Sequence, residues 1–160
     1  LMTVDLITDV TPELVEAFEK LIPQLSSSAK PMGKKALKKF VAQPGVFLFT
    51  YRAVPTGEAP VPGLDPILGM LTLVTFQIPT GKRAWIEDVV VDNGARGQGA
   101  GQALVEAALD QAKILGCVSV DLTSRPSREA ANTSASPRMS HIGTFRCSFS
   151  FQCPHEFVHQ

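Results

Sequence analysis

The chain has 160 residues, of which 15 are Lys or Arg, 15 are Asp or Glu and 44% are hydrophobic. This composition predicts one soluble domain, residues 1–160, large enough to bury a core. A formal net charge of zero disfavours binding to nucleic acid or an anionic membrane by bulk charge, so any anion must be recognised locally. The longest apolar stretches, such as residues 67–76, fall short of the ~20 residues that cross a bilayer.

The start of the chain lacks the basic and apolar segments of a secretion signal. The three cysteines, Cys117, Cys147 and Cys153, are an odd number, which argues against a disulfide framework and favours a reducing compartment. We therefore expect a cytoplasmic location.

The first part of the chain predicts a strand and two helices. Residues 3–8 form a short apolar strand, after which Thr11 caps a helix with Pro12 in its first position. A second helix is expected over residues 31–41. Its inward side chains would be Met32, Ala36, Leu37 and Phe40, and its outward side chains Lys34, Lys35, Lys38 and Lys39. The lysine run is interpreted as a solvated face rather than a patch for an acidic partner.

Strands and one long helix follow. Residues 46–51 and 68–76 are rich in branched and aromatic side chains and predict two strands. The proline-rich connection over residues 55–66 is long for a hairpin loop, as functional or mobile loops often are. Three more elements are expected after this loop: a strand over residues 84–91, a helix over 99–115 that ends at Gly116, and a buried strand over 117–122. No repeat or linker divides the chain.

A glycine-rich turn lies between the strand over residues 84–91 and the helix that begins near Gly99. Unpaired N–H groups and the dipole of a helix N-terminus favour a bound phosphate at such a turn. Glycines at 97, 99 and 101 permit positive φ and let a ligand approach the main chain. Arg96 adds a positive charge. The segment therefore predicts an anion site built from backbone.

Two nucleotide motifs do not fit this turn. A P-loop requires Lys followed by Ser or Thr after its glycines, and neither pair is present here. A dinucleotide-binding motif requires Gly-x-Gly-x-x-Gly in the first strand and helix, with an acid ~20 residues later. Gly97, Gly99 and Gly101 have the wrong spacing and lie past the middle of the chain.

The pattern Arg/Gln-x-x-Gly-x-Gly/Ala is met by residues 96–101, preceded by Glu87-Asp88-Val89-Val90-Val91 and followed later by Arg128-Glu129-Ala130-Ala131-Asn132. With these elements in order, residues 1–132 resemble the GCN5-related N-acetyltransferases (GNAT). The resemblance implies an α/β (α+β) fold: a mixed, twisted sheet flanked by helices, with acetyl-CoA in a cleft between splayed fourth and fifth strands.

The resemblance also implies which residues contact acetyl-CoA. Main-chain groups of Val89 and Val91 would bind the pantetheine arm. The amides of Gly97, Gln98, Gly99, Ala100, Gly101 and Gln102 would hold the pyrophosphate, with Arg96 beside them. Asn132, together with Ser124 and Arg128, matches positions on the far side of the cleft.

The chemistry of such a site is direct attack of an amine on the thioester carbonyl. The amine arrives as an ammonium ion, so a carboxylate must take its proton. Glu87 and Asp88 are candidates, and because neighbouring strand residues point to opposite faces, only one is expected to face the cleft. The resemblance favours Glu87. An amide near Val89 or Val90 would polarise the thioester oxygen.

The tail over residues 133–160 departs from the family pattern. It lacks the tyrosine that commonly protonates the leaving thiolate, since Tyr51 is the chain's only tyrosine. All three histidines lie after residue 140, whereas only one acid, Glu156, follows residue 130. This shift suggests the hypothesis of a changed reading frame from about residue 133. Alternation over residues 145–153 still predicts a strand that completes the sheet or pairs with a second molecule in a homodimer.

The same tail contains Cys147, Cys153, His155 and His159. Their spacing is not one that zinc sites use, so we predict no metal and interpret the two cysteines as packed on one strand face. Cys117 is interpreted as a core residue.

The sequence thus predicts an acetyl-CoA-dependent N-acetyltransferase that acts on a primary amine of a small molecule or peptide. The alternative is an acyl-CoA-binding protein of the same fold whose altered C-terminus impairs catalysis. The acceptor and the general acid stay unassigned.

Overall fold

The computed structural model of the chain describes residues 3–54, 58–61, 64–124 and 143–149. Within them, six strands form one sheet in the order β1-β2-β3-β4-β5-β6. The strands are β1 (Thr3–Leu6), β2 (Val46–Arg52), β3 (Gly69–Ile78), β4 (Gly81–Val91), β5 (Ser119–Ser124) and β6 (Gly143–Ser148). Neighbours are antiparallel except β4 and β5, which are parallel. The predicted mixed sheet is confirmed.

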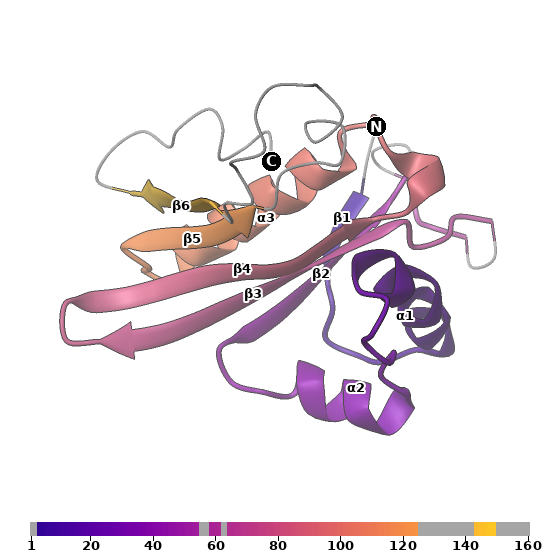
Figure 1. Cartoon of the computed structure of the whole chain (residues 1–160), viewed down its shortest axis with the longest axis horizontal. Helices are drawn as coiled ribbons and strands as arrows, with labels where there is room; N and C mark the ends of the chain where they lie inside the picture. Colours follow the sequence, from indigo (N-terminus) through magenta and orange to yellow (C-terminus); the bar gives the residue numbers. More distant parts are fainter. Residues whose placement is uncertain (1–2, 55–57, 62–63, 125–142, 150–160) are drawn as a thin grey trace, which may run out of the picture.

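Helices cover both faces of this sheet (Figure 1). Helices α1 (Pro12–Leu25) and α2 (Lys34–Val41) lie on one face and α3 (Ala100–Ile114) lies on the other. Helix α1 begins as predicted, because the hydroxyl of Thr11 accepts a hydrogen bond from the Leu14 amide at 3.2 Å.

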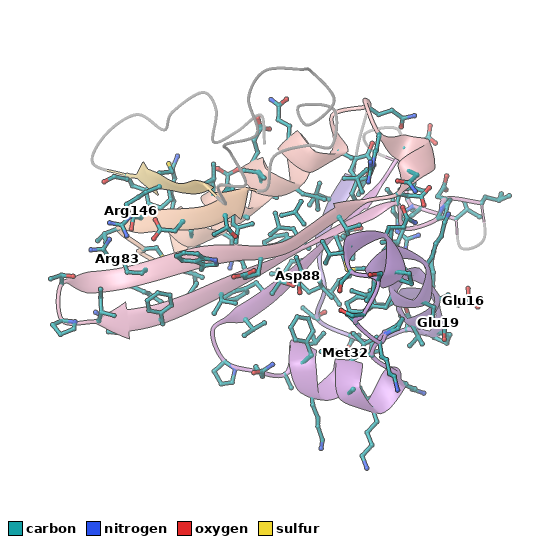
Figure 2. The ribbon with its side chains drawn as sticks, in the orientation of Figure 1. Glu16, Glu19, Met32, Arg83, Asp88 and Arg146 are labelled. Atoms are coloured by element: carbon teal, nitrogen blue, oxygen red, sulfur yellow. The ribbon has the colours of Figure 1, made fainter. Side chains whose placement is uncertain are left out.

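Helix α2 starts three residues later than the sequence suggests. Its N-cap is Gly33, so Met32 precedes the helix and is 40% exposed (Figure 2). Ala36 is exposed as well, whereas Leu37 is buried and Phe40 packs partly against the core. The expected inward face is therefore correct for two side chains and wrong for Met32 and Ala36. The four lysines are exposed, as the solvated-face interpretation requires.

Two apolar clusters hold the layers together. Leu14, Phe18 and Leu21 of α1 pack with Leu37 of α2 against Met70 and other residues on one sheet face. On the other face the buried side of α3 packs against strands β2 to β5; this cluster includes Leu71, Leu73, Ile86, Leu104, Ala108, Val120 and Leu122. Cys117 is buried in the same cluster, which confirms its core position.

Cys147 of β6 is fully buried in the α3-side cluster, as expected for strand-face packing. It is also disulfide-bonded, although the odd number of cysteines argued against a disulfide framework. The strand predicted over residues 145–153 is confirmed by β6 as far as Ser148. Residues 150–160, with Cys153, His155 and His159, lie outside the described part.

The parallel pair β4 and β5 has the crossover that parallel strands need, and here it is α3. The two strands pair only over residues 83–86 and 119–122. Beyond Ile86, β4 continues to Val91 beside β3 but no longer beside β5. The strands therefore splay, and the separation begins at Glu87.

Two further predictions concern membrane-spanning helices and the edge of the sheet. No helix in the described residues is long and apolar enough to cross a membrane. Strand β6 pairs with β5 and with no other strand in the described part of the chain. Pairing of its outer edge with a second molecule stays a prediction.

An ion pair between α1 and β2 ties the loop before β3 to the domain. Arg52 donates to both carboxylate oxygens of Glu13, at 2.5 and 2.8 Å, and to the main-chain oxygen of Asp65. The hydrogen bond from Arg52 lowers the pKa of Glu13 below its usual range. Because Glu13 binds a proton less readily when folded, its stabilising effect is present above the ordinary glutamate pKa and is lost as pH falls through the folded value.

We expect Glu13→Gln to lower the free energy of unfolding at pH 7 by on the order of 1 kcal/mol, because the pair is only partly shielded from water. Urea unfolding of the parent and the variant should show this difference shrinking as pH falls below the glutamate range. A difference that stays constant down to pH 3 would contradict the assignment.

Candidate functional site

The connection between β4 and α3 turns at two glycines. It contains the short helix η1 (Asn93–Ala95) and then residues 96–99. Gly97 and Gly99 have φ angles of +81° and +78°, a region that glycine adopts without steric cost. Gly99 is the N-cap of α3 and supplies no side-chain cap. Gly101 lies inside the first helical turn, so positive φ is observed at two of the three glycines.

The first amides of α3 are free to bind a ligand. In the described part of the chain, the first of them to find a backbone acceptor is that of Ala103, which donates to the Gly99 oxygen at 3.0 Å. The preceding amides, of Ala100, Gly101 and Gln102, have no acceptor there. Such unpaired donors carry the positive end of the helix dipole. This end of α3 therefore favours an anion.

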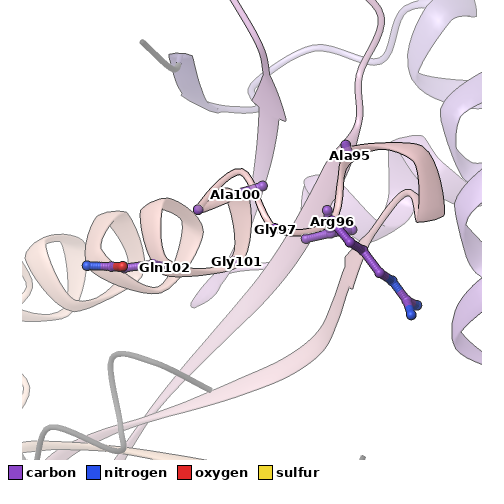
Figure 3. A pocket seen from close by; sticks show the side chains of 8 residues that line it. Ala95, Arg96, Gly97, Ala100, Gly101 and Gln102 are labelled. Atoms are coloured by element: carbon purple, nitrogen blue, oxygen red, sulfur yellow. The ribbon is translucent and has the colours of Figure 1, made fainter. Parts of the chain in front are cut away.

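A hollow of about 270 Å³ opens at these amides (Figure 3). Its lining combines the end of β4, the connection and the first turn of α3: Val91, Ala95, Arg96, Gly97, Gly99, Ala100, Gly101 and Gln102. A Cβ atom added to Gly97 or Gly101 would have no atom within 4 Å. The space that these side chains would fill is thus left to a ligand.

The polar side chains of the hollow are few. Arg96 is exposed and extends to the opposite side of the connection from Gln102 (Figure 3). Gln102 donates to Glu106 at 3.1 Å along the exposed face of α3. The glycine segment, its amides and Arg96 line one hollow at the place where the sequence predicts an anion site, and anion binding there stays a prediction. The donor set suits a phosphate or diphosphate group.

Strand β4 carries a bulge at the point where it leaves β5. Met70 is opposite Val90 and Thr72 is opposite Glu87, so β4 has one more residue than β3 in this stretch. Asp88 takes a φ of +52°, the only non-glycine residue with positive φ in the described chain. A bulge of this kind breaks the alternation of side chains.

The bulge removes the basis of one expectation from the sequence. Regular alternation was expected to turn only one of the two acids toward the cleft, but alternation is broken at Asp88, and Glu87, Asp88 and Val89 are all exposed. Figure 2 shows Asp88 where β4 passes α1, away from Arg83 and Arg146 near the other end of the strand. Alternation therefore does not decide between Glu87 and Asp88.

The valines after the bulge lie at different depths. Val89 is 36% exposed, Val90 is 5% exposed and packs on the α1 side, and Val91 lines the hollow. The main chain of this stretch borders the gap left by β5, since no β5 residue pairs with it. A chain-like ligand could add there as a strand does.

Several predicted residues are not placed at the site. Arg128 and Asn132 lie outside the described residues, as does the side chain of Ser124. Tyr51 is 1% exposed in the α3-side cluster, and burial raises its pKa. A phenol so enclosed does not face the cleft. The described residues contain no group of three or more side chains suited to a metal.

One set of contacts beside the hollow was missed from the sequence. The Gln24 side chain of α1 donates to Asp92 at 2.8 Å and accepts from the Asn93 amide at 2.9 Å. The hydrogen bond from Gln24, followed by the charge of Lys20, lowers the pKa of Asp92. No sequence motif marks a glutamine near the end of a helix, so the sequence gives no signal for this contact.

The chain was compared with protein families, curated proteins and solved structures. Residues 14–133 match the model of the acetyltransferase (GNAT) family. A search of curated proteins found no significant match.

Solved structures share the fold at low sequence identity. An acetyltransferase from Trypanosoma brucei superposes with a TM-score of 0.60 at 22% identity, covering 89% of this chain and 99% of the other. Glucosamine-6-phosphate N-acetyltransferase from Arabidopsis thaliana gives 0.61 at 18% identity, covering 89% and 98%. The NatC complex bound to Gag peptide and CoA gives 0.56 at 18% identity, covering 81% and 78%.

Proposed function

Because the chain belongs to the acetyltransferase (GNAT) family, we propose that it transfers the acetyl group of acetyl-CoA to a primary amine by direct attack. The observation that carries this proposal is the hollow at the start of α3, with free amides, open space at two glycines and Arg96 beside it. A solved neighbour with the same fold is bound to CoA. The acceptor is an amine of a small molecule or peptide.

Different parts of the site would bind different parts of the cosubstrate. The amides of residues 97–102, with the dipole of α3 and Arg96, would hold the diphosphate of CoA. The main chain of Val89 and Val91 would hydrogen-bond the pantetheine arm in the gap between β4 and β5. Asn132 would contact CoA from the far side of the cleft. The bound cosubstrate supplies a thioester carbonyl, which an amine attacks.

We assign the proton acceptor to Glu87. It is exposed and lies at the first β4 position beyond the pairing with β5, beside the bulge. The incoming ammonium must lose its proton before its nitrogen can attack, and a carboxylate nearby or linked by water can accept it. The amide of Val89 or Val90, reoriented by the bulge, would donate to the thioester oxygen as its charge grows. No general acid is assigned.

The alternative is a protein that binds acyl-CoA but turns over slowly. It is favoured by the burial of the only tyrosine, which leaves no described phenol at the cleft for the leaving thiolate. Both functions use the same hollow, so CoA binding does not separate them.

A measurement of turnover distinguishes the acetyltransferase from the acyl-CoA-binding protein. The protein would be incubated with acetyl-CoA and a panel of polyamines, aminoglycosides, amino acids and peptides with free amino termini. Mass spectrometry would detect the acetylated amine, and a thiol reagent would detect released CoA. We expect at least one amine to yield both products in equal amounts. CoA binding without any acetylated amine would favour the alternative.

A further inference from the structure

The connection that lines the hollow is intrinsically flexible. Gly94, Gly97 and Gly99 supply three glycines to a short segment, and each costs more conformational entropy to fix than another residue would. Amides can converge on an anion only if the connection is held before the anion arrives. Its position must therefore be set by contacts with the rest of the domain.

The hydrogen bonds of the connection concentrate at its first residues. The Asp92 carboxylate accepts from the Gly94 amide at 3.2 Å, and the Asp92 main-chain oxygen accepts from the Ala95 amide at 2.9 Å. These bonds form η1 but lie within the connection itself. Among described residues, the side-chain hydrogen bonds that attach it to another element come from Gln24.

The Gln24 amide group uses both of its ends. Its nitrogen donates to Asp92 and also to the Lys20 main-chain oxygen at 3.1 Å, while its oxygen accepts from the Asn93 amide. A planar group bound at both ends fixes position and orientation. Helix α1 is itself held by Leu14, Phe18 and Leu21 in the core. Lys20 adds an ammonium 3.5 Å from Asp92, but it is 55% exposed and its effect is screened.

We propose that Gln24 is a positioning residue for acetyl-CoA: through Asp92 and Asn93 it holds the connection so that the amides at the start of α3 meet the CoA diphosphate. The inference rests on the proposed function. Gln24 does not line the hollow, so it acts through the main chain and touches neither CoA nor the acceptor. Loss of Gln24 should therefore weaken binding of the CoA diphosphate and leave proton transfer to Glu87 unchanged.

The test compares Gln24→Ala with Gln77→Ala, a matched loss of an exposed glutamine whose amide reaches only the neighbouring Ile78 oxygen. We expect Gln24→Ala to raise the Kd for CoA and the KM for acetyl-CoA about tenfold, since the two hydrogen bonds that attach the connection to α1 are lost. The kcat at saturation should change by less than about twofold. Gln77→Ala should match the parent.

A truncated donor distinguishes positioning from general damage. S-acetylpantetheine carries the thioester and the pantetheine arm but no diphosphate, so Gln24→Ala should use it as well as the parent does. Equal loss with both donors would overturn the proposal, and so would unchanged CoA binding. The variant Gln24→Glu keeps the size but places a second carboxylate beside Asp92, and it should weaken CoA binding more than alanine does.

Amide hydrogen exchange in the free protein provides a readout that needs no CoA. The amides of Gly94 and Ala95, which donate to Asp92, should exchange about tenfold faster in Gln24→Ala than in Gln77→Ala, because the connection opens more often. Unchanged exchange would overturn the proposal even if CoA binds. Failure of the parent to bind CoA, with faster exchange in the variant, would contradict the proposed function and leave the structural hold intact.

Discussion

Replacing Gly101 with glutamate should abolish CoA binding without destabilising the fold. Gly101 has helical geometry, lines the hollow, and has no atom within 4 Å of an added Cβ. The new carboxylate would occupy the place of the diphosphate, and like charges brought together cost several kcal/mol. We expect the Kd for CoA to rise at least about 100-fold.

The same change should make the helix more stable. A residue with a side chain in place of glycine favours the helix by up to about 1 kcal/mol, and an anion in the first turn complements the dipole. Calorimetric titration and thermal unfolding together would therefore show affinity and stability moving in opposite directions.

Gly33→Glu is the matched control. Gly33 also stands at the start of a helix with open space around it, but it does not line the hollow. It should bind CoA as the parent does. If Gly101→Glu bound CoA within about threefold of the parent, the diphosphate would have to lie elsewhere.

Glu87→Gln should lower kcat by about 100-fold or more while CoA affinity stays unchanged. The amide keeps the size of the side chain but cannot accept the ammonium proton. The variant can use only acceptor amine that is already deprotonated. The fraction of that form grows about tenfold per pH unit below a primary amine pKa of about 10.4. Its rate should therefore rise toward pH 10 and close the gap with the parent. Steady-state kinetics from pH 7 to 10 would show this.

Asp88→Asn is the control for Glu87→Gln, because it removes the neighbouring exposed carboxylate at the bulge. Asparagine tolerates the positive φ of this position. The control should keep kcat within a few-fold of the parent. A large loss in Asp88→Asn with little in Glu87→Gln would transfer the role of base to Asp88.

Local rules were sufficient for most of the fold. Thr11 and Pro12 predicted the start of α1, and runs of branched and aromatic residues predicted β2 and β3 close to their observed ends. The glycine segment predicted the turn before α3. These signals depend on neighbouring residues, so a sequence carries them directly.

Features that depend on distant partners could not be predicted. Helix α2 begins at Lys34 because Leu37 and Phe40 reach the core, whereas Met32 does not. The bulge at Asp88 arises where β4 leaves β5, and no local pattern announces it. The contact of Gln24 with Asp92 joins positions 68 residues apart. The sequence predicted the glycine segment and Glu87 as site residues, but it did not predict the contacts of Gln24 with the connection or the bulge at Asp88.

Nuclear magnetic resonance of the labelled protein during titration with CoA would test the proposed site most directly. We expect the amide signals of residues 96–102 and of Val89 to Val91 to shift most and to saturate together, while signals from α2 stay in place. Saturating CoA that leaves the signals of Gly97, Gly99 and Gly101 unmoved would contradict the assignment of this hollow as the cosubstrate site.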